Sequence, residues 1–260
     1  KAGEIFSKYT KDMLVKSKEE NNGNIKNFLY DSAFDYYLTT NNKKRYNEIL
    51  GIHNKLADFN KTYDVMWSIE MHESMSTEAS DKKVLDLYKT IPDITPKDSR
   101  YSYVYTYGYV SQIRTGDYDT PIRAIENYIS AQKNKSDIEF GENYLDAVKA
   151  EIYIEKKDLE NAYLTINKIK EVIGDERHSS EQNLALCYFQ LGDNEKGYKY
   201  VDLFLDTKLS STNIKELFVT LQYDIRCSSA KKDPRYIDLL KKLKLYDYWK
   251  DDPEIKKLEK

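Results

Sequence analysis

Residues 150–166 read AEIYIEKKDLENAYLTI, and residues 185–201 read ALCYFQLGDNEKGYKYV. The second stretch repeats the residue types of the first at an offset of 35 positions, within a longer repeat over 144–206. The matched pairs are Ala150 and Ala185, Tyr153 and Tyr188, Lys157-Asp158 and Gly192-Asp193, Ala162 and Gly197, and Ile166 and Val201. A repeat of this length predicts stacked helical hairpins, because each hairpin needs its neighbours to bury its apolar face. We therefore predict an all-α solenoid of antiparallel helical hairpins, a fold whose extended concave surface is typical of binding proteins.

The composition also favours a helical protein. The 260 residues include only 9 glycines and 5 prolines, and 40% are hydrophobic while 33% are charged. The net charge of -3 comes from 41 basic and 44 acidic residues, and so does not favour a nucleic-acid surface, which needs clustered excess Lys and Arg. No run of 18 apolar residues is present, so we expect no membrane-spanning segment in this stretch. Because the first residue is Lys1, we expect that a signal, an anchor, another domain or simply an expression boundary preceded it.

One break divides the chain into two predicted parts. Residues 91–96 read IPDITP, and two prolines so close together predict a long loop or a hinge. We expect irregular helical hairpins over 1–95, and regular repeats with a C-terminal capping helix over 96–260. The Tyr-rich run YSYVYTYGYV at 101–110 alternates as a β-strand would. We interpret it as a helix, because a Thr-Gly-Asp turn and the spacing of a second hairpin helix follow it.

The repeat combines small residues with a glycine turn. The small residues at the helix-contact positions are Ala150 and Ala162 in one repeat, and Ala185 and Gly197 in the next. Small side chains let the two helices of a hairpin approach closely. Together with the turn LGDNEK at 191–196, this pattern resembles the tetratricopeptide repeat (TPR) family. The resemblance is good over about 140–206, partial over 101–133 and 212–245, and poor before residue 95.

The resemblance implies which residues face a partner. In a TPR-like stack the first helix of each hairpin lines the concave face. The residues that this places on the partner-binding face are Tyr144, Glu151, Ile154, Glu155, Gln182, Leu186, Phe189, Gln190, Leu221 and Asp224. We expect Ile154 and Phe189 to be exposed apolar anchors for a peptide or a helix, unless a ligand or the C-terminal segment covers them.

The C-terminal run carries a second resemblance. Residues 233–243 read DPRYIDLLKKL and begin a proline-initiated amphipathic helix that continues towards Trp249. This run is similar to the ending of many bacterial repeat domains, including sensory domains of membrane-spanning winged-helix regulators of the CadC kind. That resemblance implies the sensory or regulatory part of a bacterial transcription regulator, outside the cytoplasm and within a larger or processed protein. Cytoplasmic peptide-sensing regulators with helical repeats are the alternative.

No motif in the sequence has the pattern of an active site. There is no Gly-rich phosphate loop, no G-x-S-x-G and no C-x-x-C motif, and the three histidines, His53, His72 and His178, are scattered. We interpret Cys187 and Cys227 as partly buried free thiols, with a disulfide between neighbouring helices as the alternative. We therefore expect no metal, no cofactor and no catalysis.

The function that these observations predict is recognition of a protein or peptide. The alternative is a structural adaptor in an envelope or secretion assembly. We do not expect this segment to bind nucleic acid directly. The oligomeric state stays open, with a homodimer formed through capping helices as one arrangement.

Overall fold

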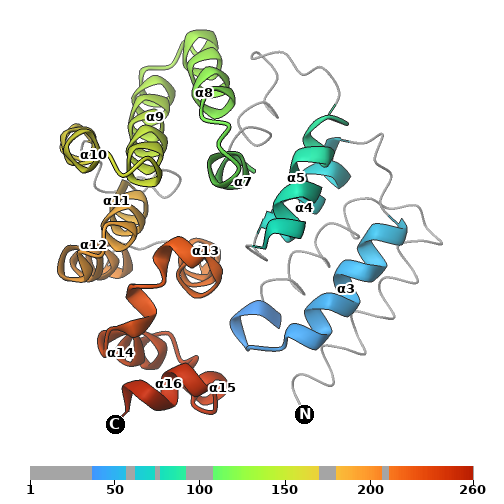
Figure 1. The fold of residues 1–260 in the computed structure, drawn as a ribbon, viewed down its shortest axis with the longest axis vertical. Coiled ribbons are helices and arrows are strands. Elements are labelled where there is room, and N and C mark those ends of the chain that lie inside the picture. The colour runs from blue at the N-terminus through green and yellow to red at the C-terminus, as the bar shows by residue number, and fades with distance from the viewer. Residues whose placement is uncertain are drawn as a thin grey trace.

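A computed structural model describes the chain over residues 37–56, 62–73, 77–91, 108–169, 180–206 and 211–259. All of the regular structure in these ranges is helical, and none of it is strand (Figure 1). The predicted all-α class is therefore confirmed. No helix within the described ranges combines the length and the apolar character that crossing a membrane requires.

The helices carry the labels of Figure 1. The first part of the chain forms α3 (Lys43–Leu56), α4 (Thr62–Glu73) and α5 (Glu78–Tyr88). The middle part forms α7 (Tyr109–Arg114), α8 (Asp119–Ala131), α9 (Lys135–Glu155), α10 (Leu159–Ile166), α11 (Ser180–Gln190) and α12 (Asn194–Asp206). The last part forms α13 (Ser211–Tyr223), the short 3-10 helices η1 (Ile225–Cys227) and η2 (Ala230–Lys232), and α14 (Arg235–Lys242), α15 (Tyr246–Trp249) and α16 (Pro253–Leu258).

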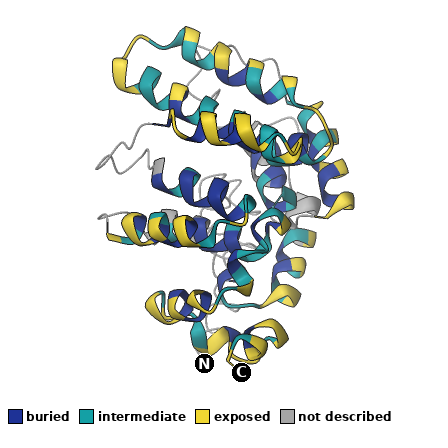
Figure 2. Cartoon of the chain, turned by 60° about the vertical axis from the view of Figure 1, so that its left-hand side comes forward, coloured by how far each residue is buried: buried dark blue, intermediate teal, exposed yellow. Residues whose placement is uncertain are grey.

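Helices that follow one another in the sequence also pack together. α8 and α10 both pack against α9, α11 packs against α9 and α12, and α4 packs against α5. Figure 2 shows that these helices bury one side and expose the other, as amphipathic helices do. In Figure 1 the chain runs from α8 and α9 at the top of the molecule to α14, α15 and α16 at the bottom, and α3, α4 and α5 lie on the other side. Helix α7 lies below α8 and contacts both α9 and α5.

The 35-residue repeat has a structural counterpart in the turns. Lys157 between α9 and α10 and Gly192 between α11 and α12 both have left-handed backbone conformations, with φ of 60° and 78°. The residue after each turn position donates its backbone N–H to the carbonyl five residues back, from Asp158 to Tyr153 and from Asp193 to Tyr188, both at 2.9 Å. This hydrogen bond defines a Schellman motif, which ends a helix and reverses the chain.

An aspartate caps the helix after each of these turns. Asp158 Oδ1 accepts a hydrogen bond from the Asn161 N–H at 3.3 Å, and Asp193 Oδ1 accepts one from the Lys196 N–H at 3.1 Å. Each carboxylate thereby satisfies an N–H group that the first helical turn leaves without a partner. The same turn and aspartate cap recur outside the 35-residue repeat at Gly116-Asp117, before α8. Asn41-Asn42 before α3 makes the same turn, with the Asn42 amide oxygen in place of the carboxylate.

The predicted helix over 101–110 is wrong at its C-terminal end. Residues 101–107 lie outside the described ranges, but Gly108 has φ of 87° and α7 begins only at Tyr109. The position also has no space for a side chain, because a Cβ there would lie 2.2 Å from Cε2 of Tyr88. A helix therefore cannot run through Gly108 into α7.

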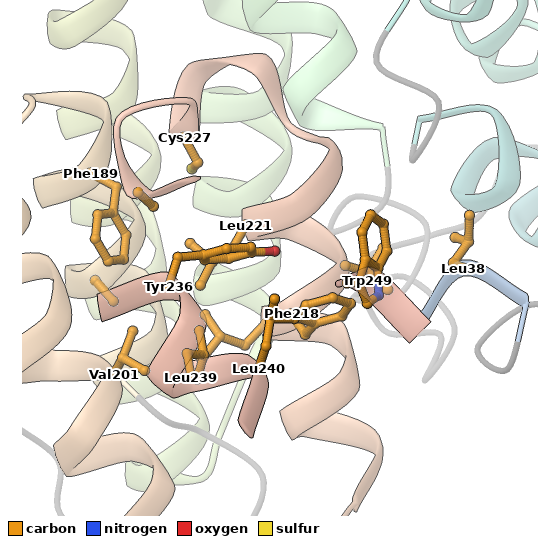
Figure 3. Close-up of a cluster of buried hydrophobic side chains, with 14 of the residues drawn as sticks. Leu38, Phe189, Val201, Phe218, Leu221, Cys227, Tyr236, Leu239, Leu240 and Trp249 are labelled. Atoms are coloured by element: carbon orange, nitrogen blue, oxygen red, sulfur yellow. The ribbon is translucent and has the colours of Figure 1, made fainter. Parts of the chain in front are cut away.

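The largest apolar cluster joins the two ends of the described chain. Trp249 of α15 is buried between Phe218 of α13 and Leu38 (Figure 3). Its indole Nε1 donates a hydrogen bond to the Thr39 carbonyl at 2.7 Å, and Tyr223 Oη donates one to the Leu38 carbonyl at 2.9 Å. The residues just before α3 therefore pack onto the C-terminal helices, although about 200 positions separate them.

The two cysteines are free and buried, which confirms the interpretation as free thiols. Cys187 belongs to α11 and Cys227 to η1, and neither side chain is exposed. Burial raises the pKa of both thiols well above the usual value, and neighbouring carboxylates raise it further. Both cysteines are therefore held in the unreactive protonated form.

Candidate functional site

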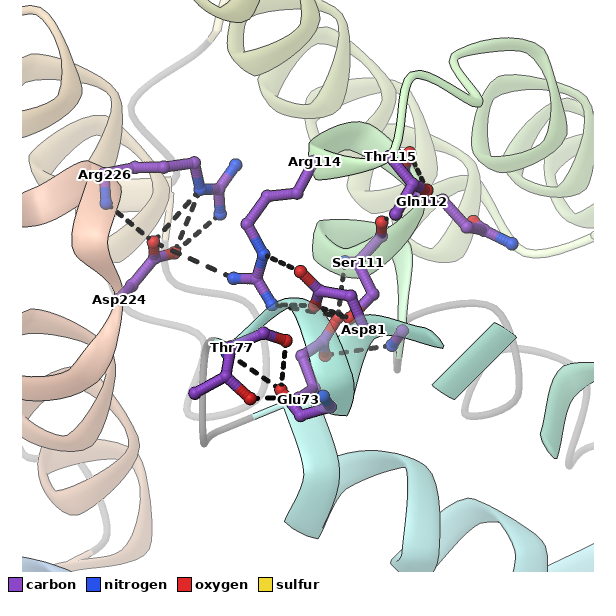
Figure 4. A network of polar contacts seen from close by, with 11 residues as sticks. Glu73, Thr77, Asp81, Ser111, Gln112, Arg114, Thr115, Asp224 and Arg226 are labelled. Carbon is purple, nitrogen blue, oxygen red and sulfur yellow. Dashed lines mark hydrogen bonds and ion pairs between the residues drawn. The ribbon is translucent and has the colours of Figure 1, made fainter. Parts of the chain in front are cut away.

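Charged side chains from distant parts of the chain meet in one buried network (Figure 4). We call it the polar network, and its members are Glu73, Asp81, Tyr109, Ser111, Arg114, Glu151, Asp224 and Arg226. They come from α4, α5, α7, α9 and the start of η1. Burying charge is unfavourable unless each charge is paired and hydrogen-bonded, so the geometry of the pairs decides what this region can do.

Arg114 holds the N-terminal side of the network. Its guanidinium Nε donates to Asp81 Oδ2 at 3.0 Å, and Nη2 donates to Asp81 Oδ1, which is the bidentate arrangement that binds carboxylates most strongly. Ser111 Oγ also donates to Asp81 Oδ1, at 2.7 Å. The side chains of Arg114 and Asp81 are only 10% and 8% exposed, so solvent screens this pair little.

Glu73 is the last residue of α4, and its side chain lies beside the first residues of α7. Its carboxylate accepts backbone N–H bonds from Gly108 at 2.9 Å and from Ser111 at 3.1 Å. Burial raises the pKa of the Glu73 carboxyl, and the two N–H bonds and the charges of Arg114 and Arg226 oppose that rise only in part. The left-handed Gly108 is what turns its N–H towards Glu73, so this cap depends on the glycine.

Arg226 holds the C-terminal side of the network. Its Nη1 donates to Glu151 Oε2 at 2.6 Å, and its Nη2 donates to Asp224 Oδ2 at 2.7 Å. Tyr109 Oη donates to the other oxygen of Glu151 at 3.0 Å. Although burial alone would raise the pKa of Asp224, the charge and hydrogen bonds of Arg226 lower it below the usual value. The same carboxylates raise the pKa of Arg226 against the effect of its own burial, so the guanidinium stays charged.

The two sides of the network meet at Asp224. Arg114 Nη1 lies 4.0 Å from Asp224 Oδ1, so Asp224 faces both guanidinium groups. Figure 4 shows Arg114 lying between Asp81 and Asp224. The network therefore ties α5 and α7 to η1 and, through Arg226, to α9.

An aromatic row continues from the network along α9. Tyr109 and Tyr144 meet edge to face with ring centroids 5.8 Å apart, and Tyr144 stacks on Phe140 at 6.0 Å. Tyr109, Phe140 and Tyr144 are each half-buried. Ile225, between Asp224 and Arg226 in the sequence, is 66% exposed. The apolar side chain of Ile225 therefore reaches solvent, whereas the charged side chains of Asp224 and Arg226 on either side of it are buried.

The structure joins three of the predicted site residues through this network. Tyr144 contacts Tyr109, Tyr109 binds Glu151, and Arg226 connects Glu151 to Asp224. The three predicted residues are therefore neighbours in one connected set, but they face protein groups. Glu151 and Asp224 are 3% and 5% exposed, so they do not offer free carboxylates to a ligand.

Three other predicted site residues lie in the apolar core. The expected binding positions Leu186, Phe189 and Leu221 are buried in the largest cluster, and Phe189 is not an exposed anchor. The ring of Phe189 packs against Gly197 and Tyr198 of α12, the second helix of its own hairpin, and Ser229 Oγ donates a hydrogen bond to its backbone carbonyl at 2.5 Å. All three positions are therefore closed to a partner by the other residues of this cluster.

The remaining predicted site residues have some exposure. Glu155 is exposed, and Gln182 and Gln190 are partly exposed. Ile154 is half-buried, because it packs against the cluster that contains Ala150 and Leu184. Ile154 is therefore not the exposed anchor that we expected, whereas Glu155 stays available to a partner.

The sequence reasoning missed the two arginines at the centre of the network. Only 7 of the 41 basic residues are arginine, and Arg114 and Arg226 are among them. Arginine is the cation that suits buried bidentate pairs, whereas lysine is more strongly hydrated. Rare arginines in a lysine-rich chain are thus a signal that could have pointed to these positions. Rarity could not point to Glu73 and Asp81, because the sequence contains 42 other acidic residues.

The arrangement pairs the charges of the network with one another. Every charged member of the network has a hydrogen-bonded counterpart or an N–H partner. Across the described part of the chain, no three His, Cys, Asp or Glu side chains are grouped so that they could hold a metal ion. Comparison with protein-family models, curated proteins and solved structures found no match to this chain.

Proposed function

We propose that this chain is a non-catalytic helical-repeat module that binds a protein or a peptide, with its hairpins arranged as a TPR-like solenoid. The recurrence of one turn and one aspartate cap at an offset of 35 residues supports that arrangement. The resemblance that the sequence of residues 233–249 bears to the ending of bacterial sensory domains favours a regulatory role for this chain.

The observation that carries the binding role is the aromatic row beside the polar network. Phe140 and Tyr144 are half-buried and stacked, so their rings are already ordered before a partner arrives. Ordered aromatic side chains bind with little loss of conformational entropy, and such residues dominate binding energy at protein interfaces. The network behind them resists movement, because displacing a buried charge from its counterpart is costly.

The partner that suits this surface has apolar side chains. Phe140 and Ile225 supply apolar contacts, and the buried charges of the network are already paired. A peptide would therefore anchor through aliphatic or aromatic side chains, with exposed groups such as Glu155 contributing at the border.

Selection from a random peptide display library tests this proposal. Peptides are selected on the 260-residue chain, and their affinities are measured for Phe140→Ala and Ile225→Asp. We expect selected peptides to bind each variant at least roughly tenfold more weakly, as loss of a central contact produces. The control is Leu203→Asp on α12, which replaces another exposed apolar residue and should leave affinity unchanged.

Thermal unfolding of each variant separates loss of binding from loss of folding. Peptides that bind all variants equally would contradict the proposed surface. A library that yields no peptide above background would contradict the peptide-binding role.

A further inference from the structure

The C-terminal residues 245–259 contact the end of the helical segment that precedes α3. We call these residues the strap, and they comprise α15, α16 and the residues that flank these helices. Residues 37–39 are helical and are followed by the Asn41-Asn42 turn. The last carbonyl groups of a helix have no partner within the helix. Trp249 of the strap supplies one, because its indole Nε1–H donates to the Thr39 carbonyl at 2.7 Å.

Tyr223 of α13 extends this contact beside the strap. Its hydroxyl donates to the Leu38 carbonyl, and its ring meets the Trp249 indole edge to face, with centroids 6.3 Å apart. Nζ of Lys43, at the start of α3, lies 5.6 Å from the centroid of the Tyr223 ring. Figure 3 shows the indole between Phe218 and Leu38. One aromatic group therefore holds the residues around the start of α3, and its central member comes from the strap.

Few apolar side chains of the strap are buried. Within residues 245–259, all of which the structure describes, only Trp249 and Ile255 are buried. In α11, by contrast, residues 184–189 are buried without exception. A segment with few buried apolar contacts opens at a lower free energy than the core of the same protein. The strap therefore has the character of a segment that opens before the repeat hairpins unfold.

The ion pairs of the strap join its own residues to one another. The three pairs are Lys250 with Asp247 at 3.1 Å, Lys256 with Asp251 at 2.9 Å, and Lys257 with Glu254 at 2.6 Å. Movement of the strap as one unit breaks none of these pairs. The attachment that such a movement breaks is therefore mainly apolar, with the Trp249 hydrogen bond at its centre.

A left-handed residue connects the strap to α14. Lys244 has φ of 58°, and the N–H of Leu245 donates to the Leu240 carbonyl five residues back at 2.8 Å. The turns after α9 and α11 contain the same hydrogen bond. Lysine adopts a left-handed conformation at a cost in free energy, and such a residue persists when its surroundings hold it. Lys244 is therefore the position at which the strap pivots most readily.

We propose that the strap opens and closes as one unit about Lys244, and that its opening releases residues 37–42 from the C-terminal helices. In the closed state the Trp249 indole packs against Phe218 and binds the Thr39 carbonyl. In the open state the repeat stays folded, because α9, α11 and α12 pack on one another. The strap thereby makes the position of the N-terminal residues depend on the C-terminal segment. This inference is independent of the proposed peptide surface on α9 and η1.

Hydrogen–deuterium exchange of the 260-residue chain, followed by mass spectrometry, tests this proposal. The reporter is the group of backbone amides at 41–46, where Asn42 N–H donates to the Tyr37 carbonyl at 2.8 Å. Trp249→Ala should speed their exchange at least roughly 100-fold, because the indole and its hydrogen bond are both lost. Trp249→Phe keeps an aromatic ring and loses the N–H donor, so it should speed exchange about tenfold. The amides of α9 and α11 should exchange at the parent rate in Trp249→Phe.

Two more variants test the strap without removing the indole. Tyr248→Ala is the matched control, because Tyr248 is the neighbouring aromatic residue of α15 and is 49% exposed. It should leave exchange at 41–46 unchanged. Lys244→Gly removes the cost of the left-handed backbone and so favours the closed state. This variant should slow exchange at 41–46 about threefold.

Trp249→Phe is the mildest of the changes to the indole, and its outcome is decisive. Exchange that rises equally at 41–46, in α9 and in α11 overturns the proposal, because Trp249 would then stabilise the chain as a whole. Exchange at 41–46 that stays at the parent rate overturns it as well. Faster exchange at 41–46 in Lys244→Gly would contradict the pivot at Lys244.

Discussion

Arg226 of η1 donates a hydrogen bond from Nη1 to Oε2 of Glu151 in α9 at 2.6 Å, across 75 positions of sequence. The same guanidinium binds Asp224, so one cation pairs with two buried carboxylates. The pair joins the C-terminal segment to the repeat hairpins at a place where little solvent enters, since the side chains are 10% and 3% exposed.

Arg226→Met should destabilise the fold by about 3–5 kcal/mol, because it leaves Glu151 and Asp224 as buried charges without their cation. Urea unfolding followed by circular dichroism measures this change. The control is Arg235→Met, which removes a pair with Asp233 in which Arg235 is 44% exposed. That control should cost about 1 kcal/mol or less. Equal losses in the two variants would contradict the structural importance of the network.

The Glu73 carboxyl should make stability depend on pH. Burial raises its pKa in the folded chain, so the folded state holds the proton more tightly than the unfolded state does. The stability from this group is fully present below the unfolded pKa of about 4.3 and is lost as pH rises through the folded pKa. Glu73→Gln removes this dependence, so the variant should gain stability relative to the parent as pH rises.

Urea unfolding of the parent and of Glu73→Gln between pH 4 and 8, roughly the range around and above the unfolded pKa, measures that difference. Glu195→Gln, at an exposed site in α12, is the matched control. A difference between parent and Glu73→Gln that stays constant with pH would mean that Glu73 titrates as an ordinary carboxyl.

Gly197→Ala should destabilise the fold by about 1–3 kcal/mol through overpacking. A Cβ at Gly197 would lie 2.5 Å from Cε1 of Phe189, and the ring is fully buried. At the equivalent positions the preceding repeat has Ile154, which is smaller than Phe189, and Ala162, which is larger than Gly197. Phe189→Ile/Gly197→Ala reproduces that combination and should lose less stability than the two single variants together.

Gly51→Ala is the control for the effect of glycine on helix propensity. Gly51 lies in α3, and an added Cβ would meet no atom within 4 Å. This variant should gain about 0.5–1 kcal/mol. Chemical denaturation of the set tests the packing argument, and a neutral Gly197→Ala would contradict it.

Lys157→Gly should stabilise the chain by roughly 0.5–1 kcal/mol, because Lys157 has φ of 60° and glycine adopts this conformation without steric cost. The reciprocal change, Gly192→Ala, should destabilise it by about 1 kcal/mol. An added Cβ at Gly192 meets no atom within 4 Å, so that variant measures only the cost of placing a side chain on a left-handed backbone. Melting temperatures that shift in the same direction for both variants would disprove the equivalence of the two turns.

Much of the local structure could be predicted from the repeat. The offset of 35 residues and the Gly192-Asp193 turn predicted helices joined by tight turns, and the all-α class is confirmed. Schellman bonds and aspartate caps connect residues at most five positions apart, so the information for them lies within one short window. The end of the Tyr-rich run was harder to predict, because the surroundings of Gly108 are formed by Tyr88 and Glu73, which are distant in sequence.

The candidate site could be predicted only in part. The register of the first helices singled out Tyr144, Glu151 and Asp224, and these lie in one connected set. It predicted that they face a partner, however, whereas Glu151 and Asp224 are buried against the unrecognised Arg226. Phe189 was expected at a surface, yet Ser229 and Tyr198 cover it. Exposure is a property of what packs against a residue, and a periodic pattern cannot reveal how a later segment returns to cover an earlier helix.

The sequence by itself determined the helices, their turns and the spacing of the repeat, because these depend on hydrogen bonds and apolar periodicity within short segments. Only the tertiary structure decided that Trp249 packs against residues before α3, and that Arg226 neutralises Glu151. Such contacts form when segments far apart in sequence are brought together by burial of apolar surface. Burial then requires every enclosed charge to find a counterpart, which decides the members of the network.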